Sequence, residues 1–400
     1  MRERIKRLLP SWFLCLLKNL RYVLISCLFR IFHLFPIDNK LIVVCNVWGF
    51  GDNAKYIAKE LSKRKQKEKK EFKIVFITNR IKNEYKNSNI QDNILMYKTN
   101  SIKAIYALSR ARIWVDNNRK ENYIKKRKGQ YYIQTWHGGI ALKKIEKDYR
   151  ALPISYVKNA KRDSKMTDLY VSNSSFCSKM FRTSFWYQGE ILECGSPRND
   201  IILNCSEDEK LRIRRRLGIK NERVAIYAPT YRESKDASIY QLDYARLLKA
   251  LEERFKAPFI LAVRLHPLVA SMSDKLEYND HIINASSYGD LYELMAISDV
   301  MITDYSNIMF EFSFLKKPVF LYANDMMEYE KDRGFYFNYN SLPYEKAQTE
   351  EDLINNIKSF EAKSYERKVN EFLSRLEIYE TGKASEIVVD RIMKKLESYE

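Results

Sequence analysis

The sequence lacks the patterns that mark metal sites, disulfide frameworks and membrane spans. Its six cysteines form no CxxC pair, and none stands at metal-ligand spacing from one of the four histidines. The sequence therefore predicts neither a zinc site nor disulfides, and the thiols are those of a reduced, cytosolic chain. The most apolar segment, residues 8–35, is interrupted by Lys18, Arg21, Arg30 and His33, whereas a helix that spans a bilayer needs ~20 mainly apolar residues.

Nucleotide-binding signatures are also few. No Walker A sequence and no DxD occurs, so we expect no metal site and no cofactor, while a divalent-metal requirement stays open. The turn GFGDNA (49–54) matches GxGxxA, but the next strand ends in TNR (78–80) and not in the acid of a dinucleotide site. Trp48, Asp52 and Asn53 also fit a phosphate cradle poorly, which disfavours nucleotide binding at this turn.

Positive charge is what the sequence has in excess. Its 400 residues carry 70 Lys and Arg against 51 Asp and Glu, a net charge of +19. Three basic runs lie in the first third of the chain, at residues 1–40, 63–70 and 119–128. Nucleic acid, anionic lipid and a polyanionic substrate all attract such charge. No recognisable nucleic-acid-binding module accompanies it, so we expect no nucleic-acid partner.

Residues 1–39 are predicted to form an amphipathic segment on a membrane surface. On a helical wheel, one half collects the apolar side chains Leu17, Leu20, Leu24, Leu28, Ile31 and Phe35, and the basic side chains lie opposite. With four basic residues ahead of it, this pattern favours a helix in the plane of an anionic leaflet. A signal peptide without a clean cleavage site, or a helix packed on the protein's own core, is the alternative.

From residue 40, short apolar strands alternate with helices, which predicts parallel sheets covered on both faces. The expected strands are 41–45, 72–78, 94–97, 113–116, 131–135, 169–172 and 191–194, then 224–228, 259–265, 281–284, 300–303 and 319–322. The length favours two domains, 40–218 and 219–400, the second ending in a helical tail. The predicted fold is α/β, with two doubly wound, Rossmann-like halves facing a cleft.

The segment 297–339 combines a buried strand, a hydroxyl-rich turn and a helix start. Apolar residues 300–303 end in DYSN (304–307), after which apolar side chains recur at helical spacing. Ser306 or Asn307 is expected to cap this helix, whose free N–H groups would seat a phosphate. An ordinary βαβ unit with a well-chosen cap is the alternative.

Two histidines end predicted strands, one in each half of the chain. His137 precedes paired glycines, and His266 precedes a proline. Open α/β sheets place their sites at the carboxyl ends of strands, although a structural role is equally open for each histidine. Three arginines begin loops, where a guanidinium suits either a phosphorylated ligand or a surface ion pair: Arg198, Arg232 and Arg333.

Together and in order, these segments resemble the CDP-glycerol glycerophosphotransferase family of teichoic acid synthesis. The matching pieces are DNAKYI (52–57), WVDNNR (114–119), YIQTWHGG (132–139), LKK (142–144), VSNSSF (171–176), GSPRND (195–200), YAPTYR (227–232), RLHP (264–267), SDVMITDYSNIMFEF (298–312) and KDRGFYF (331–337). The resemblance implies a GT-B fold and transfer of a polyol phosphate from a CDP-activated donor to a hydroxyl, with release of CMP. It also implies a peripheral protein at the cytoplasmic face of the cell membrane.

The resemblance further implies roles for single residues. His137 is expected to act as the base for the acceptor hydroxyl and His266 to contact or protonate the donor phosphate, with an exchange of the two roles left open. Donor contacts are expected at Arg232, Asp304, Ser306, Asn307, Glu311 (for the ribose hydroxyls), Arg333 and Gly334. Acceptor or phosphate contacts are expected at Asp52, Asn53, Trp136, Lys143 and Arg198.

Two positions depart from the family's pattern. GIA (139–141) stands where a threonine-proline pair commonly follows WHG, and Asn307 stands where TDYSS has its second serine. The first departure bears on acceptor preference and the second on contacts with the donor phosphates. The expected donor is CDP-glycerol, with CDP-ribitol as an alternative, and the expected acceptor is undecaprenyl-linked. A sugar-nucleotide glycosyltransferase of the same fold is the other alternative.

Overall fold

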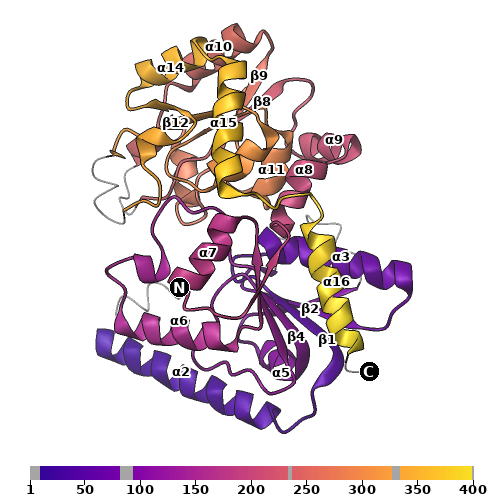
Figure 1. The fold of residues 1–400 in the computed structure, drawn as a ribbon. Helices are drawn as coiled ribbons and strands as arrows, with labels where there is room; N and C mark the ends of the chain where they lie inside the picture. Colours follow the sequence, from indigo (N-terminus) through magenta and orange to yellow (C-terminus); the bar gives the residue numbers. More distant parts are fainter. Residues whose placement is uncertain (1–9, 82–92, 233–236, 327–333, 399–400) are drawn as a thin grey trace.

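Two parallel β-sheets organise the chain, one in each of the two domains that lie above one another in Figure 1. The computed structural model describes residues 10–81, 93–232, 237–326 and 334–398. The predicted α/β class with two parallel sheets is confirmed, since every strand pair in both sheets is parallel.

The first sheet has seven strands in the order β3-β2-β1-β4-β5-β6-β7. They are β1 (Asp38–Cys45), β2 (Lys73–Thr78), β3 (Ile94–Lys98), β4 (Ala111–Asp116), β5 (Tyr131–Gln134), β6 (Leu169–Ser172) and β7 (Glu190–Glu193). Residues 41–45 are all buried, as expected for an apolar run in a sheet covered on both faces. The strand order reverses between β1 and β4, the kind of switch point at which such sheets bind ligands.

Helices connect the strands of the first sheet. They are α3 (Asp52–Glu68), α5 (Ile102–Arg110), α6 (Ile154–Met166) and α7 (Ser175–Ser184). Two of them begin at serine caps, because the side chains of Ser101 and Ser174 accept hydrogen bonds from the N–H groups of Ala104 and Cys177. These caps fix where α5 and α7 start and thus where the preceding strand-end loops finish.

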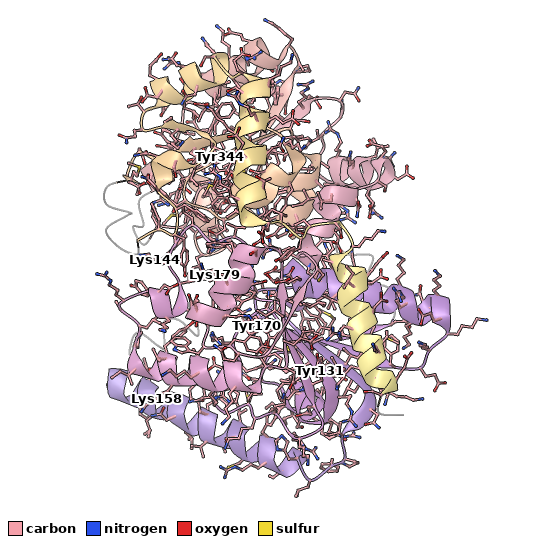
Figure 2. All side chains as sticks on the ribbon, viewed as in Figure 1. Tyr131, Lys144, Lys158, Tyr170, Lys179 and Tyr344 are labelled. Atoms are coloured by element: carbon pink, nitrogen blue, oxygen red, sulfur yellow. The ribbon has the colours of Figure 1, made fainter. Side chains whose placement is uncertain are left out.

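The second sheet has six strands in the order β10-β9-β8-β11-β12-β13. They are β8 (Arg223–Tyr227), β9 (Phe259–Val263), β10 (Ile282–Asn284), β11 (Val300–Thr303), β12 (Val319–Tyr322) and β13 (Glu345–Ala347). Its helices include α10 (Tyr244–Phe255), α11 (Leu291–Ile297), α12 (Ile308–Phe312), α14 (Glu350–Lys358) and α15 (Ala362–Leu376). Tyr344, labelled in Figure 2, lies inside this upper domain and Tyr170 inside the lower one.

The chain passes between the domains twice. It leaves the first sheet through α8 (Asp200–Asn204) and α9 (Glu207–Arg216), and returns after α15 into α16 (Ala384–Glu397). The sequence predicts that residues 219–400 form the second domain. In the structure, α16 packs on the first domain instead. Its buried residues Val388, Val389 and Ile392 belong to the core beside β1 and α3, because the apolar face of α16 covers the first sheet.

Helix α2 (Ser11–Phe32) precedes the first sheet and packs against α5. Ile25 and Phe29, which the wheel places among the polar side chains, are buried in the core with α5. The opposite face exposes large apolar side chains: Leu16, Leu17, Leu20, Val23, Leu24 and Ile31. The helix therefore packs on the protein along one face and leaves an apolar face uncovered. Within the part of the chain that the structure describes, no helix is long and apolar enough to cross a bilayer.

Candidate active site

The carboxyl-end loops of the two sheets meet at the domain interface. The N–H of Leu142 donates to Asn307 Oδ1 at 2.9 Å, and the N–H of Tyr336 donates to the Leu142 carbonyl at 2.7 Å. The N–H of Lys144 donates to the Gly334 carbonyl at 3.0 Å, and Lys144 lies level with the interface in Figure 2. The segment after β5 is thus held against the loops of the second domain, where both histidines also lie.

His137 stands just beyond β5, with its ring exposed at the domain interface. Its Nδ1 lies 2.9 Å from the Asn117 carbonyl oxygen, which can only accept a hydrogen bond. Nδ1 therefore carries the proton, and Nε2 keeps its lone pair. The surrounding protein desolvates the charged ring and lowers the pKa of His137, so that the ring is neutral at pH 7. A neutral imidazole with a free Nε2 is the form of a general base.

The residue before His137 is held in an unusual backbone conformation. Trp136 has a φ of 54°, and its ring centroid lies 4.3 Å from that of His137. Asn53 Nδ2 donates to the Trp136 carbonyl at 3.0 Å, while Asn53 Oδ1 accepts from the N–H of Arg198 at 3.1 Å. Both Asn53 and Trp136 are buried. Their contacts support the turn that presents His137, and no contact with a ligand is needed to explain them.

An ion network joins this turn to the second domain. The Arg198 guanidinium donates to Asp52 at 2.8 Å and to Glu311 at 3.1 Å, and Glu311 also accepts from the Tyr292 hydroxyl at 2.8 Å. Asp52 in turn accepts from Asn117 Nδ2 at 2.9 Å. Removing one member of such a buried ion pair costs ~3–5 kcal/mol, because it leaves an uncompensated charge.

The network changes how two expected ligand contacts are interpreted. Arg198 is 3% exposed and Glu311 1% exposed, and both are engaged with protein groups. The structure thus favours an interdomain role for Arg198 over a phosphate contact. The assignment of Glu311 to the ribose hydroxyls stays a prediction, although both of its carboxylate oxygens already accept hydrogen bonds.

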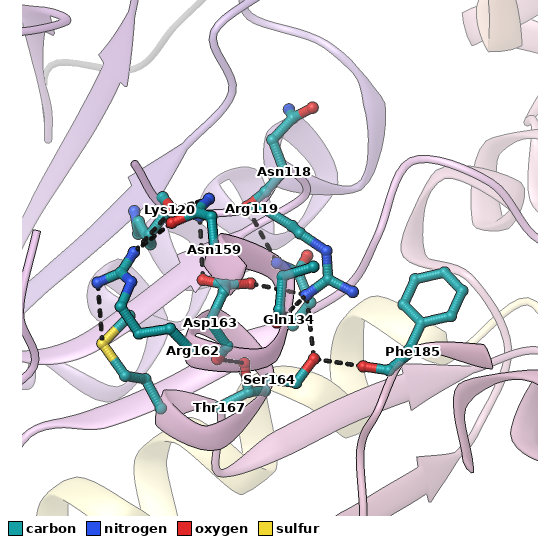
Figure 3. A network of polar contacts seen from close by, with 12 residues as sticks. Asn118, Arg119, Lys120, Gln134, Asn159, Arg162, Asp163, Ser164, Thr167 and Phe185 are labelled. Carbon is teal, nitrogen blue, oxygen red and sulfur yellow. Dashed lines mark hydrogen bonds and ion pairs between the residues drawn. The ribbon is translucent and has the colours of Figure 1, made fainter. Parts of the chain in front are cut away.

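Arg119 supports the Trp136 turn from the other side, and Figure 3 shows the polar contacts that Arg119 makes with Asp163 and Ser164. Its guanidinium pairs with Glu146 at 2.7 Å and Asp163 at 3.2 Å, and lies 5.6 Å from the Trp136 ring. Its neighbour Lys120 is also buried and pairs with Asp116 at 2.6 Å. Two basic residues of the run 119–128 are therefore buried in ion pairs and do not belong to an exposed basic surface. Sequence reasoning missed Asn117 and Arg119 as site supports, although both lie in the motif WVDNNR.

His266 lies just beyond β9, also with an exposed ring. Its Nδ1 accepts a hydrogen bond from the N–H of Leu268 at 3.2 Å, so the neutral ring carries its proton on Nε2. Desolvation, together with the charges of Lys143 and Arg264, lowers the pKa of His266. The ring therefore presents an N–H donor, the opposite of His137. Lys143 belongs to the first domain, so its charge acts across the interface.

Arg232 and Asp304 bind one another beyond β8 and β11. Arg232 pairs with Asp304 at 2.8 Å and with Asp325 at 2.6 Å, and Asp304 accepts the Thr230 N–H at 2.9 Å. The Arg232 guanidinium also lies 5.0 Å from the Tyr305 ring. These contacts shape the loops of the expected donor site, while direct donor contacts by Arg232 and Asp304 stay predictions.

Asn307 occupies the N-cap position of the helix, as expected, but its side chain does not make the expected capping bond. Helix α12 begins at Ile308 and spans only five residues. Asn307 instead accepts from Leu142 of the first domain, because the interface supplies a nearer donor. Ser306 is partly buried, and its hydroxyl has no hydrogen-bond partner among the described residues. It stays available to a ligand.

Two further predictions concern the loop after β12. Arg333 lies outside the described residues. Gly334 has a φ of 68°, a conformation that favours glycine, and its carbonyl accepts from Lys144. Across the described ranges, no group of three or more His, Cys, Asp and Glu side chains could hold a metal ion.

Comparisons with known proteins match most of this chain. A family model described as CDP-glycerol:poly(glycerophosphate) glycerophosphotransferase matches residues 27–394. The teichoic acid poly(glycerol phosphate) polymerase of Bacillus spizizenii is 30% identical over 92% of this chain and 95% of its own length. That of Staphylococcus epidermidis is 34% identical over 75% of this chain, which spans only 44% of that protein. The teichoic acid glycerol-phosphate transferase of Staphylococcus aureus is 31% identical over 78% of this chain and 84% of its own length.

Solved structures show the same architecture. A structure of the wall teichoic acid polymerase TagF superimposes with a TM-score of 0.81 at 30% identity, covering 96% of this chain and 98% of that one. A histidine variant of TagF soaked with CDPG gives a TM-score of 0.82 at 28% identity, with the same coverage of both chains.

Proposed function

The chain belongs to the CDP-glycerol:poly(glycerophosphate) glycerophosphotransferase family, and we propose from this that it transfers glycerol phosphate from CDP-glycerol to a hydroxyl of a lipid-linked acceptor, releasing CMP. The observation that carries the proposal is the opposite proton placement on the two interface histidines. One ring offers a lone pair that can accept the proton of the attacking hydroxyl. The other offers an N–H that can donate to the phosphate, and hydroxyl attack on a phosphate needs both.

The proposed step begins at the acceptor hydroxyl. His137 Nε2 takes the hydroxyl proton as the oxygen attacks the β-phosphorus of the donor. A new phosphorus–oxygen bond forms while the bond from the β-phosphorus to the bridging oxygen breaks, and that electron pair leaves with CMP. The His266 Nε2–H and the charge of Lys143 face the phosphates, where they stabilise the charge that develops on the leaving group.

The choice of glycerol over ribitol rests on the relatives. Glycerol-phosphate polymerases are 30–34% identical to this chain, whereas a ribitol-phosphate polymerase and a ribitol-phosphate primase are 28% and 29% identical. CDP-ribitol is therefore the second candidate donor. The sugar-nucleotide alternative has the support of a structure solved with UDP, but its 13% identity and TM-score of 0.53 show a similar fold and no more.

We further propose that the protein works at the cytoplasmic face of a membrane, on an undecaprenyl-linked acceptor. The exposed apolar face of α2 supports this, since Leu16, Leu20 and Leu24 are each more than half exposed. Basic side chains on the same helix, such as Arg21 and Arg30, would face anionic headgroups.

The test is to incubate the protein separately with CDP-glycerol and with CDP-ribitol, each with and without a lipid acceptor, and to measure CMP. We expect acceptor-dependent CMP release with CDP-glycerol and a slower or absent release with CDP-ribitol. If neither donor gives CMP, the proposal is contradicted. If CDP-ribitol gives CMP faster than CDP-glycerol, the second candidate donor replaces the first.

A further inference from the structure

The two chain crossings between the domains are fastened to each other. Glu380 lies on the return crossing, residues 377–383, and both of its carboxylate oxygens lie 3.1 Å from the N–H of Ser196 on the outgoing crossing. Asn199 Nδ2 donates to Glu380 Oε1 at 2.7 Å. Asn204 Nδ2 donates to the Gly382 carbonyl at 2.6 Å. We call these contacts of Glu380 and Asn204 the crossing clamp.

The same turn also starts the returning helix. Asp200 Oδ1 accepts from the N–H of Ala384 at 3.0 Å, and Oδ2 accepts from the N–H of Ser385 at 2.7 Å. The carboxylate thereby satisfies two free N–H groups at the start of α16 and places its negative charge at the positive end of that helix. The motif GSPRND (195–200) thus contacts the return crossing at Ser196, Asn199 and Asp200.

Close packing at two glycines shows how tightly the crossings fit. A Cβ on Gly195 would lie 2.6 Å from Glu380 Oε2, and a Cβ on Gly382 would lie 2.2 Å from Asn204 Nδ2. Their φ values of 98° and 75° also suit only glycine. No larger residue fits at either position while the clamp is closed.

The turn that the crossing clamp holds contains Arg198, which is connected to the candidate base His137 through hydrogen bonds of Asn53. The Arg198 N–H donates to Asn53, whose side chain holds the Trp136 carbonyl next to His137. The Arg198 guanidinium binds Asp52 on one domain and Glu311 on the other. A shift of the turn would therefore move both the support of His137 and the ion pair between the domains.

We propose that Glu380 is a positioning residue for the phosphate transfer: by holding the turn at Ser196–Asn199, it sets Arg198 and, through Asn53, the place of His137 relative to the donor domain. The inference rests on the proposed function for its kinetic test, but the clamp itself can be tested without substrate. Burial raises the pKa of Glu380 to about 8, so a neutral amide is the closest mimic of this side chain near pH 7.

The kinetic test compares Glu380→Ala with Glu380→Gln. We expect Glu380→Ala to lower kcat by ~10²-fold with little change in KM for CDP-glycerol, because a displacement of ~1 Å at the reacting centre has this effect. Glu380→Gln keeps a carbonyl acceptor for the Ser196 N–H and should restore kcat to within about threefold of the unaltered chain. Glu386→Ala is the matched control, since that carboxylate lies exposed on α16, and it should leave kcat unchanged.

A second measurement tests the clamp without turnover. Hydrogen exchange of the free protein should rise at residues 195–200 and 135–139 in Glu380→Ala, but not in Glu386→Ala. Unchanged exchange in both segments, or an unchanged kcat in folded Glu380→Ala, overturns the inference. A Glu380→Gln variant as slow as Glu380→Ala also overturns it. Should the unaltered chain release no CMP, the proposed function fails, while the exchange result still decides whether Glu380 holds the turn.

Discussion

At the scale of single residues, the two interface histidines differ in the nitrogen that holds the proton. His137 is expected to act in the chemical step, so His137→Ala should lower kcat by ~10²-fold or more with little change in KM. His266 is expected to face the donor phosphates, so His266→Ala should lower kcat by a similar factor and also weaken donor binding. CMP release gives both constants, and thermal denaturation checks that the variants fold. A near-normal rate in either variant removes that histidine from the mechanism.

The pH dependence follows from the environment of His137. Desolvation by the surrounding protein lowers the pKa of His137, while the Asp52 carboxylate raises it and the Arg198 charge lowers it. A base works when it is unprotonated, so kcat/KM should fall only at acidic pH, below the ordinary histidine pKa of ~6.5. In Asp52→Asn the carboxylate is gone and Arg198 is less neutralised, and both changes lower the pKa of His137 further.

The acidic limb of the kcat/KM profile should therefore move to lower pH in Asp52→Asn, whatever happens to the maximal rate. Asp390→Asn is the matched control, because Asp390 is an exposed carboxylate that pairs with Arg64 at 2.7 Å and, within the described ranges, with no other basic side chain. A limb that moves to higher pH would contradict the assignment of His137 as the titrating base.

Sequence patterns could locate these histidines but not their supports. A histidine at the end of an apolar strand is visible in the sequence, and so is a glycine pair after it. The pairing of Arg198 with Glu311 joins residues 113 positions apart, and periodicity carries no information on such a contact. The capping bond that the Asn307 side chain does not make has the same cause, since its partner Leu142 comes from the other domain.

At the scale of elements, most strands could be predicted because parallel strands are continuous apolar runs. Strand β13 was missed, since it has three residues and only Ala347 is buried. A helix was expected within residues 1–39, and α2 lies there, but the wheel could not show that Ile25 and Phe29 are buried against α5. Deleting the whole segment would therefore expose core residues of the first domain as well as remove the proposed membrane contact.

Point changes on the exposed face of α2 give a cleaner test of membrane binding. We expect Leu16→Gln, Leu20→Gln and Leu24→Gln together to reduce co-sedimentation with anionic vesicles at least ~10-fold, because each leucine buried in lipid contributes ~1.5–3 kcal/mol. Binding by the unaltered chain should also fall at high salt, since part of it is electrostatic. Exposed Leu211→Gln on α9 is the control. If the triple variant binds the vesicles as well as the unaltered chain does, the exposed face of α2 is not the membrane contact.

At the scale of the whole molecule, α16 makes the first domain depend on residues far along the chain. Ile392 is fully buried with the first sheet, so Ile392→Ala should lower the free energy of unfolding by ~2–5 kcal/mol. Hydrogen exchange should show the loss at β1 and β4 before β8 and β11. Lys394→Ala, at an exposed position on the same helix, is the control. Equal loss of protection in both sheets would contradict the assignment of α16 to the first domain.

The return of α16 also has a consequence for how the protein is made. Roughly 190 residues separate the end of β7 from the start of α16, and at ~5–20 residues per second a ribosome needs on the order of 10–40 s to translate them. During that interval the nascent first sheet has all its strands but not the helix that covers part of its apolar surface. The second domain is complete before the first can close, so the nascent chain offers that bare surface to chaperones until the final helix emerges from the exit tunnel.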